Sequence, residues 1–559
     1  MGKDGIDWAS VRAASALKNL RKQVDVIKTG TQMAPGPLPL HKSVYTSEER
    51  FQAERKHIFL GQPLVAGLSG DIPNAGDMIL FDAAGPSILV ARGKDGKARA
   101  FLNMCTHRGA KLVEEQEPWA GKAKKISCPF HAWTFETGEG KLIGQPGAEG
   151  FKNCDIGARD LIELPCAEYI GLIFVKADPD GTPIDAKEHL GSFAPELAQI
   201  ELHRAEPVKK GILTADSNWK FALDTYGEGY HFSTLHKTTI AHFYYNDKCV
   251  YDPYDKHHRV TFPDFSVGEL IDKTESEWPK TSYGGVHFLF PNTVIFFGAV
   301  TADSYFTQVF RLFPDGVGKT RCHFAVYAPF GIDDAAHKKM CEDNYDSTGT
   351  VVQDEDYLVA SNGYVNLLSA PKDHHVVLGA NEIALHDVHK NIAKVIGMPL
   401  NRSEIVIPQF GELLAPYLGA VPPEAFPYLL SELERTAAAR YREWANQIPE
   451  HKEGLTKCAD AEDEIANRAA ALFPASQEHQ DLVASIIPEA KATYYAAFEP
   501  YKPAEQVYIQ SKAERQGANA WQTLKETYPE KGEALDALSE LESESADYLD
   551  KILPELLKA

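Results

Sequence analysis

Two short segments, Cys105-Thr106-His107 and Cys128-Pro129-Phe130-His131, decide how this chain of 559 residues is built. Each segment pairs one cysteine with one histidine, and twenty residues separate the two pairs. That interval is long enough for a hairpin that places the two segments face to face. The sequence therefore predicts one metal centre that two thiolates and two imidazoles share.

Two kinds of metal centre use this set of ligands. In a Rieske [2Fe-2S] cluster, two cysteines bind one iron and two histidines bind the other. The ligands would then be Cys105, His107, Cys128 and His131. A structural zinc ion can also take two cysteines and two histidines, but zinc sites usually place both cysteines in one short segment. The mixed pairs favour the Rieske cluster, with zinc as the alternative.

Composition and charge limit the partners of the chain. With 44% hydrophobic residues it can bury several cores, and its length predicts roughly two to four domains. The formal net charge of −22 would repel nucleic acid and anionic membrane surfaces. The expected partners are a small-molecule substrate and an electron-carrying protein that binds a local basic patch.

The other cysteines and the N-terminus predict a cytoplasmic protein. Six cysteines lie far apart along the chain and are expected to be free thiols in a reducing compartment: Cys154, Cys166, Cys249, Cys322, Cys341 and Cys458. The first thirty residues contain no apolar signal-peptide core. No apolar run reaches the roughly 18 residues that a membrane-spanning helix requires.

Changes of pattern along the chain predict four parts in an α+β multidomain fold. Apolar residues at helical spacing predict an N-terminal helical arm over residues 1–55. Short β-rich runs divided by turns predict an all-β Rieske domain over 56–178. Residues 179–403 mix both patterns and predict a helix-grip-like α+β catalytic domain with an antiparallel sheet. A helical C-terminal extension, for packing or subunit assembly, is expected over 404–559, where no internal repeat is evident.

Apolar runs predict the individual strands of the two middle domains. In the all-β domain the expected strands cover 78–81, 87–91, 100–103 and 171–175, with a hairpin turn at Asp95-Gly96. In the following domain they cover 284–290, 293–297, 306–313 and 320–328. Four consecutive strands of this kind are wide enough to form the floor of a pocket.

A second set of candidate ligands lies between Asn218 and His236. Mononuclear iron(II) that binds O₂ uses two imidazoles and one carboxylate, which makes His231 and His236 candidate ligands. They stand five residues apart, about 140° on a regular helix, so one must lie at a helix end or on a distorted turn. Asp224, Glu228 and His231 have the spacing of one helical stripe, on which a carboxylate can fix the tautomer of a ligand imidazole. The alternative is a solvated helix face.

The third ligand must come from another part of the chain. The acidic run Asp354-Glu355-Asp356 follows a helical pattern and offers two candidates, Asp354 and Asp356. On a regular helix Glu355 would face the other way. His386 and His389 stand three apart on an expected helix, where lining a pocket or lying on the surface is a simpler interpretation than binding a metal.

The residues around both ligand sets resemble the Rieske-type ring-hydroxylating oxygenase large (alpha) subunit. The resemblance rests on Cys105-Thr-His-Arg-Gly-Ala-Lys-Leu, on Cys128-Pro-Phe-His-Ala-Trp133, and on Asn218-Trp-Lys followed by acid-X-Tyr-His-X₄-His. Many members of this family have tyrosine and glycine where Phe130 and Ala132 stand. The missing phenol removes one hydrogen bond near the cluster, so its potential is expected to differ from the family norm.

The resemblance implies roles for the candidate residues. It assigns a mononuclear Fe(II) to His231 and His236. The spacing between the acidic run and the family-like residues that follow it favours Asp356 over Asp354 as the third ligand. It implies that Glu228, where many members have aspartate, links this iron to the Rieske centre of a neighbouring subunit. Asp224 joins Glu228 as a candidate catalytic acid.

The resemblance also implies an activity. The expected enzyme uses O₂ to hydroxylate an apolar, aromatic substrate, with ring dihydroxylation first and monohydroxylation or oxidative demethylation as alternatives. A head-to-tail homotrimer is expected, with a separate small subunit possible. The electrons must come from a ferredoxin or reductase, because the chain lacks a Gly-X-Gly-X-X-Gly fingerprint after a strand. The expected pocket or core residues are Phe221, Phe232, Phe288, Phe290, Phe296, Phe297 and Phe306.

Two functions of other classes stay open. The chain could be a Rieske electron-transfer protein whose catalytic domain is inactive, or a binding protein that zinc stabilises. Iron content distinguishes the first from the oxygenase, and a colourless preparation would identify the second.

Overall fold

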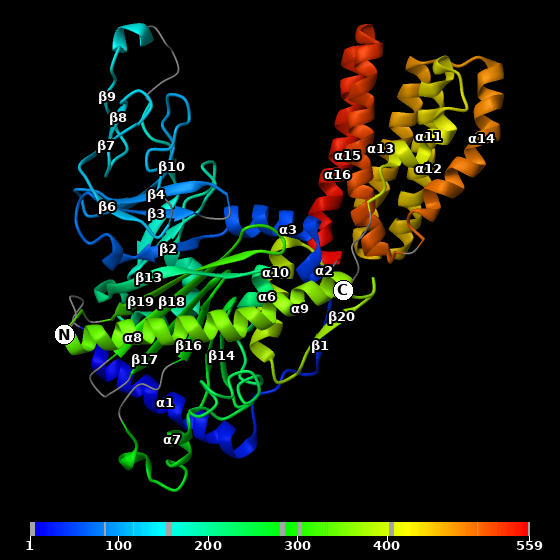
Figure 1. Cartoon of the computed structure of the whole chain (residues 1–559). Coiled ribbons are helices and arrows are strands. Elements are labelled where there is room, and N and C mark those ends of the chain that lie inside the picture. The colour runs from blue at the N-terminus through cyan, green and yellow to red at the C-terminus, as the bar shows by residue number, and fades with distance from the viewer. Residues whose placement is uncertain are drawn as a thin grey trace. The chain divides into compact units, whose positions relative to one another are not determined.

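The computed structural model describes residues 6–82, 85–115, 117–152, 159–279, 285–299, 305–329, 331–332, 334–401, 407–499 and 501–556. The chain forms two compact units, Met1–Ile396 and Gly397–Ala559 (Figure 1). The predicted boundary at 403/404 and Cys154 both lie outside the described residues. The seven described cysteines are free thiols. No helix of the described part is both long and apolar enough to cross a bilayer.

The first unit begins with helices and one strand that wrap onto later segments. Helix α1 (Trp8–Thr29) is followed by β1 (Leu38–His41), which pairs antiparallel with β20 (His375–Leu378). Helices α2 (Ser43–Thr46) and α3 (Glu48–Glu54) follow, and a π-helical stretch continues α3 over Arg55–Leu60. These residues contact parts of the chain far away in sequence, so the N-terminal arm belongs to the body of this unit.

The β-domain consists of strands, as the sequence predicts, and these form three small antiparallel sheets. The largest has the order β10-β5-β4-β3-β6, and the others are β11-β12-β2 and β7-β8-β9. The hairpin predicted at Asp95-Gly96 joins β4 to β5, and Gly96 has the positive φ of 79° that favours glycine. The strands are β2 (Leu64–Leu68), β3 (Asp77–Asp82), β4 (Ser87–Arg92), β5 (Ala98–Leu102), β6 (Ala120–Lys122), β7 (Lys125–Ser127), β8 (Thr134–Glu136), β9 (Leu142–Gly144), β10 (Glu163–Leu164), β11 (Cys166–Tyr169) and β12 (Leu172–Val175).

A seven-stranded antiparallel sheet forms the centre of the next domain, in the order β13-β19-β18-β17-β16-β15-β14. The four predicted strands are β16 to β19, and the sequence pattern missed β13, β14 and β15. The bounds are β13 (Glu206–Ala215), β14 (Val250–Tyr254), β15 (His257–Thr261), β16 (Gly285–Leu289), β17 (Thr293–Ala299), β18 (Tyr305–Pro314) and β19 (Thr320–Ala328). This sheet and the preceding β-domain confirm the predicted α+β class.

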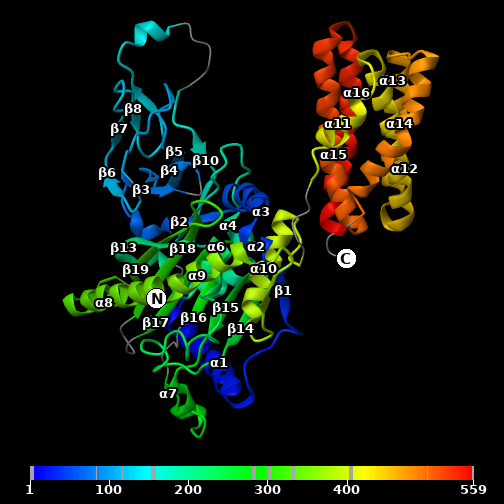
Figure 2. The same cartoon turned by 45° about the vertical axis from the view of Figure 1, so that its right-hand side comes forward.

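Helices cover both faces of the large sheet. On one face lie α6 (Trp219–Asp224), α8 (Ala335–Val351) and α9 (Tyr357–Ser369), which contact β13, β18 and β19 (Figures 1 and 2). Helix α10 (Ile383–Ile396) ends the unit. On the other face, α4 (Ala186–Leu190) and α5 (Ala194–Ala198) share one hydrophobic core with β2, β12, β17 and β18. This common core joins the β-domain to the sheet.

The second unit is helical, as predicted. Its short α11 (Phe410–Leu418) precedes α12 (Phe426–Gln447), α13 (Lys452–Leu472), α14 (Gln477–Ala496), α15 (Pro503–Thr527) and α16 (Gly532–Leu556). Helices α12 and α13 form one hairpin and α15 and α16 form another (Figure 2). Buried aromatic and aliphatic side chains of both hairpins, such as Trp444, Leu455 and Leu549, fill the space between them.

Candidate metal centres

The two Cys-His segments form loops with the same backbone hydrogen bonds. The N–H of Cys105 donates to the carbonyl of Ala110 at 2.8 Å, and the N–H of Cys128 donates to that of Trp133 at 2.8 Å. The N–H four residues after each cysteine donates back to the cysteine carbonyl, at 2.9 and 3.0 Å. Gly109 and Ala132 occupy matching positions with φ of 79° and 56°. Ala132, where the family often has glycine, thus adopts a left-handed conformation that alanine disfavours.

In these loops the two cysteine side chains lie next to each other, and so do the two histidine side chains. Cys105 and Cys128 are buried and their thiols hydrogen bond with each other. The rings of His107 and His131 lie with centroids 4.7 Å apart, and His107 stacks on Trp133 with an interplanar angle of 9°. The pairing of two sulfurs and of two imidazoles fits a [2Fe-2S] cluster with one iron on each pair.

Burial controls the chemistry of these ligands. It raises the pKa of the Cys105 thiol, and the neighbouring Cys128 acts in the same direction. Two thiolates at this position therefore need a positive charge beside them, which the irons of a cluster supply. His131, in contrast, is exposed, and the exposed Phe130 packs on it with ring centroids 3.8 Å apart. The histidine side of the centre thus faces outward.

The second ligand segment is not the continuous helix that the spacing of its acids predicts. Helix α6 ends at Asp224, before Glu228 and His231. Two glycines follow within five residues, and a side chain at Gly227 would collide with Leu385. Glycine weakens a helix, so the chain continues in turns. The predicted stripe of three residues is therefore wrong, and His231 lies on a turn.

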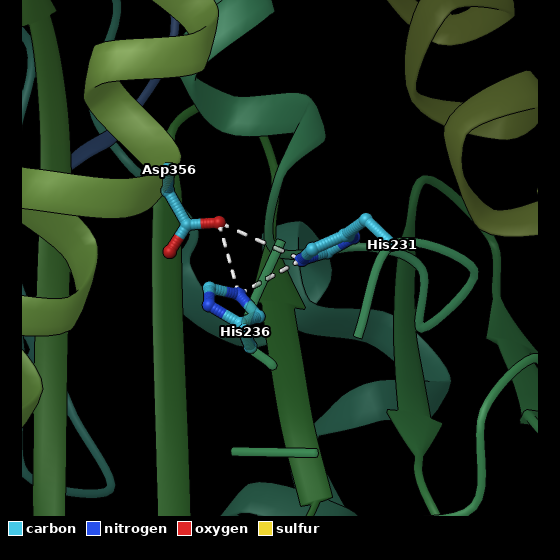
Figure 3. Close-up of side chains that lie close together, drawn as sticks. All are labelled: His231, His236 and Asp356. Atoms are coloured by element: carbon cyan, nitrogen blue, oxygen red, sulfur yellow. Dashed lines mark hydrogen bonds and ion pairs between the residues drawn. The ribbon is translucent and has the colours of Figure 1, made fainter. Parts of the chain in front are cut away.

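The structure brings His231, His236 and Asp356 together (Figure 3). His231 Nε2 lies 3.1 Å from His236 Nε2 and 3.5 Å from Asp356 Oδ1, and His236 Nε2 lies 3.3 Å from that oxygen. Three ligands on one face of an iron lie about 3 Å apart. Asp356 Oδ1 is buried, and it has no hydrogen-bond partner within the described ranges. These observations fit a metal ion bound by two nitrogens and one oxygen.

Two further carboxylates fix the tautomers of the histidines. His231 Nδ1 hydrogen bonds with Glu228 Oε1, and His236 Nδ1 hydrogen bonds with Glu355 Oε2 at 2.5 Å. A carboxylate accepts, so both Nδ1 atoms carry the proton and both Nε2 atoms offer a lone pair to the shared point. The site thus has the donor atoms that a metal requires.

Glu355 does not face away, because the helix is irregular at this point. Between α8 and α9 the chain makes a π-helical turn over Val352–Asp356. The extra residue of such a turn lets Glu355 and Asp356 approach His236 from two sides. Asp354, the alternative ligand, is exposed and lies outside the group of three.

The carboxylates make this position favourable for positive charge. Burial lowers the pKa of His231, but the neighbouring carboxylates of Asp356 and Glu228 outweigh it and raise the value to about 9. The pKa of His236 is raised for the same reasons, with Asp356 and Glu355 acting against burial. Burial raises the pKa of Asp356, yet both histidines outweigh this effect and lower it.

Asp224 lies in a different network from the one predicted. Its Oδ2 accepts from the Tyr45 hydroxyl at 2.7 Å, and its Oδ1 lies 3.0 Å from His389 Nε2. Both partners are buried, so His389 is neither at the surface nor a member of the group of three. His386 is also buried, and its Nε2 bonds to the Gly379 carbonyl at 3.0 Å. Asp224 anchors α6 to α2 and α10.

Of the predicted pocket phenylalanines, Phe232 contacts the candidate iron site. Its ring centroid lies 5.1 Å from that of His231 and 5.0 Å from that of Phe262. Phe221 packs on Tyr45 instead, at 5.0 Å. Phe288, Phe296, Phe297 and Phe306 lie in strands of the sheet and Phe290 follows β16, and all of these except Phe296 are buried. For most of these rings the alternative interpretation, plain core packing, is the observed one.

Two family models match the first unit. The Rieske [2Fe-2S] domain matches residues 62–155, and the ring hydroxylating alpha subunit (catalytic domain) matches residues 197–398. The helices of the second unit, which begin at Phe410, lie outside both matches.

Individual relatives agree with these models. The carnitine monooxygenase oxygenase subunit of Escherichia coli (strain K12) is 32% identical over 194 residues, which are 34% of this chain and 50% of that protein. The 2-halobenzoate 1,2-dioxygenase large subunit of Burkholderia cepacia is 31% identical over 219 residues, 37% of this chain and 45% of that protein. The chain thus spans about half the length of the curated relatives it matches.

Solved structures share the fold. A quaternary ammonium Rieske monooxygenase, crystallised with an inhibitor, has a TM-score of 0.54 at 24% identity. The match covers 64% of this chain and 94% of that one. Naphthalene 1,2-dioxygenase with bound indole has a TM-score of 0.51 at 19% identity, covering 64% and 92%.

Proposed function

We propose that this chain, which belongs to the family of Rieske-type ring-hydroxylating oxygenase alpha subunits, uses O₂ and electrons from a redox partner to hydroxylate a small molecule. The observation that carries the proposal is the convergence of His231, His236 and Asp356 on one point, with the Nδ1 protons of both histidines held by carboxylates. A Rieske protein that only carries electrons has no use for this second arrangement.

Each protein group has a defined task. Cys105, Cys128, His107 and His131 would hold the [2Fe-2S] cluster, and the group of three would hold a mononuclear iron(II). When bound, the cluster supplies electrons one at a time and the mononuclear iron supplies O₂ activation. Glu228 and Glu355 keep the Nδ1 protons in place, so each Nε2 stays available as a ligand.

We place the electron path between subunits. Within the described part of the chain, no hydrogen bond or ion pair joins the two Cys-His loops to Glu228 or His231. The exposed ring of His131 can instead approach a neighbouring copy. Glu228 is suited to receive it, because the backbone N–H groups of Tyr230 and His231 both donate to Oε2 and hold the carboxylate against His231. A head-to-tail homotrimer would repeat this contact around a ring.

The substrate belongs to one of two classes. Phe232 beside the histidines, with Phe262 packed against it, can stack on an aromatic ring, and the 31% identity to a halobenzoate dioxygenase favours such a substrate. The same rings can bind a quaternary ammonium group through cation–π contacts, and the 32% identity to carnitine monooxygenases favours that class. Dihydroxylation corresponds to the first class and monooxygenation to the second.

Metal analysis followed by a substrate assay tests the proposal. Purified protein should contain about three irons and two acid-labile sulfides per chain. With NADH, a reductase, ferredoxin and O₂, it should hydroxylate either a benzoate or a trimethylammonium compound such as carnitine. About two irons without turnover of either class would indicate an electron-transfer protein instead. A colourless zinc protein would contradict both. We expect the chain in the cytoplasm, where such electron donors reside.

A further inference from the structure

Four glutamates point into the core of the helical unit, one from each of its long helices. Glu434 lies on α12, Glu462 on α13, Glu514 on α15 and Glu542 on α16. Glu434, Glu462 and Glu542 each offer an oxygen atom, and these atoms lie within 4.8 Å of one another. Glu514 completes the set, because its charge raises the pKa of both Glu462 and Glu542. We call these four residues the glutamate cluster.

The four glutamates occupy equivalent positions of an internal repeat in the sequence. The first and third members of the cluster stand eighty residues apart in the sequence, and so do the second and fourth. The turns that connect the helices of each hairpin, Pro449–His451 and Pro529–Lys531, have the same spacing. Each hairpin therefore contributes one glutamate from each of its helices. The sequence does not make this repeat evident, because few of the residues between these positions match.

Glu462 has no neutral or positive partner for its carboxylate. Its side chain is 0% exposed, and neither Oε1 nor Oε2 has a hydrogen-bond partner in the described part of the chain. Its strongest charged neighbours are the other three members of the cluster, all carboxylates. A buried carboxylate among like charges is strongly unfavourable unless something positive joins it.

Neutral donors orient other members of the cluster without balancing their charge. The Tyr441 hydroxyl donates to Glu514 Oε1 at 2.8 Å, and Gln510 Nε2 donates to the same oxygen at 2.5 Å. Trp521 Nε1 donates to Glu542 Oε1 at 3.0 Å. These side chains fix the carboxylates in place, as residues around a metal site do for its ligands.

We propose that the glutamate cluster binds a hard divalent cation of the Mn²⁺, Mg²⁺ and Ca²⁺ class. Carboxylate oxygens are the ligands that these ions prefer, and the cluster offers oxygen alone. The cation supplies the positive charge that Glu462 lacks and ties the two hairpins together. This site is independent of the two iron centres, because it lies on other residues in the other unit. Its competitor is a set of protons that the four carboxylates share.

Manganese binding to the full-length chain tests this proposal. The chain is treated with a chelator, Mn²⁺ is added, and bound manganese is counted by equilibrium dialysis and by the EPR signal of the free ion. Glu462→Gln and Glu542→Gln keep the shape of the side chain and remove its charge. Matched controls are Glu464→Gln and Glu544→Gln, because these glutamates lie two positions further along the same helices and are exposed.

Manganese binding by the variants distinguishes a bound cation from shared protons. We expect the two cluster variants to bind at least one manganese less per chain, or to bind it at least about tenfold more weakly, while both controls match the original chain. His236→Ala separately accounts for manganese held at the other candidate site. Equal binding in the original chain and in the cluster variants would overturn the proposal in favour of shared protons.

A second measurement covers the case in which the cluster variants do not fold. In the His236→Ala chain, which keeps the cluster intact, Mn²⁺ should raise the unfolding temperature of the helical unit, because an ion that binds the folded state stabilises it. An unfolding temperature that does not respond to Mn²⁺ would also overturn the proposal.

Discussion

Glu228 and Glu355 each accept a hydrogen bond from the Nδ1 atom of one histidine. The two carboxylates differ in the other groups that donate to them. Glu355 also accepts from the Thr239 hydroxyl at 2.9 Å, which keeps it within the site. Glu228 is held by backbone N–H groups next to the exposed Tyr230. Their side chains are 13% and 21% exposed, so exposure does not distinguish them. We assign the contact with a neighbouring subunit to Glu228 because the family resemblance implies it, and the two should then differ when they lose their charge.

We predict separate effects for Glu228→Gln and Glu355→Gln. Glu228→Gln should retain iron and lower turnover by roughly 10- to 100-fold, because the path from the cluster to His231 loses its carboxylate. Glu355→Gln should weaken iron binding by about tenfold and leave electron delivery intact once iron is restored. Iron content and the rate at which the reduced cluster is reoxidised check both. Full, coupled turnover in Glu228→Gln would remove that residue from the path.

A buried histidine makes the first unit sensitive to acid. His257 Nδ1 accepts from the Phe290 N–H at 3.0 Å and its Nε2 donates to the His189 carbonyl at 2.8 Å, so its neutral form is fixed. Burial lowers its pKa from 6.5 to about 4. The folded state thus binds fewer protons than the unfolded state between these values. The stability that this group contributes is present above pH 6.5 and is lost as the pH falls to about 4.

We therefore predict that acidification from pH 6.5 to 4 costs the first unit roughly 3 kcal/mol through His257 alone. His257→Gln should flatten the pH dependence of the free energy of unfolding, even where it lowers stability at pH 7. Denaturant titrations at several pH values measure this slope. An unchanged slope in the variant would assign the acid sensitivity to other groups.

At this scale the spacing of residues predicts ligands where the chemistry is local, whereas the distant ligand Asp356 is predicted by the family resemblance. Cys105 and His107 are two residues apart, so their pairing is visible in the sequence. The choice between Asp354 and Asp356 depends on a π-helical turn that no spacing rule indicates. The partner of Asp224, His389, is 165 residues away, and only the folded chain brings the two together.

Among the elements, α6, which precedes the candidate iron ligands in the sequence, is held by a buried ion pair. Lys220 Nζ lies 2.6 Å from Glu54 Oε1 of α3, and Trp219 Nε1 donates to Glu54 Oε2 at 2.8 Å. Both charged side chains are almost fully buried, at 1% and 0% exposure. In the intact pair each charge balances the other. Removal of either side chain would leave the remaining charge buried without a partner.

We predict that Glu54→Gln destabilises the first unit by roughly 3–5 kcal/mol, because it leaves the Lys220 ammonium buried without a counter-charge. The matched control is Asp346→Asn, which removes the exposed partner of Lys209 and should cost less than about 1 kcal/mol. Denaturant unfolding of both variants measures the difference. Similar small losses in the two would show that α6 does not need the pair.

Strand β15 shows why the sequence pattern missed it. Strand β15 carries His257, His258 and Arg259, all buried. Arg259 forms ion pairs with Glu196 and Asp252. A strand whose core-facing residues are polar does not show the apolar run on which the prediction relies. Strands β16 to β19 are rich in buried aliphatic and aromatic side chains, which explains why they were predicted.

On the scale of the whole molecule, the proposed electron path requires more than one chain. Each chain carries both candidate centres, but the exposed side of the His131 loop and the Glu228 carboxylate would meet across a subunit contact. Two different inactive chains should then complement each other. One carries His131→Ala and lacks a working Rieske centre, and the other carries His236→Ala and lacks a working mononuclear site.

We predict that mixed oligomers of these two chains recover activity. In a cyclic trimer, each mixed ring contains one contact between an intact Rieske centre and an intact iron site. Random assembly of equal amounts would therefore restore about a quarter of the original turnover. The two chains are expressed together, because exchange between preformed oligomers is slow, and each chain alone serves as the control. If electrons stayed within one chain, the mixture would be as inactive as its parts, and the contact between subunits would have no role in catalysis.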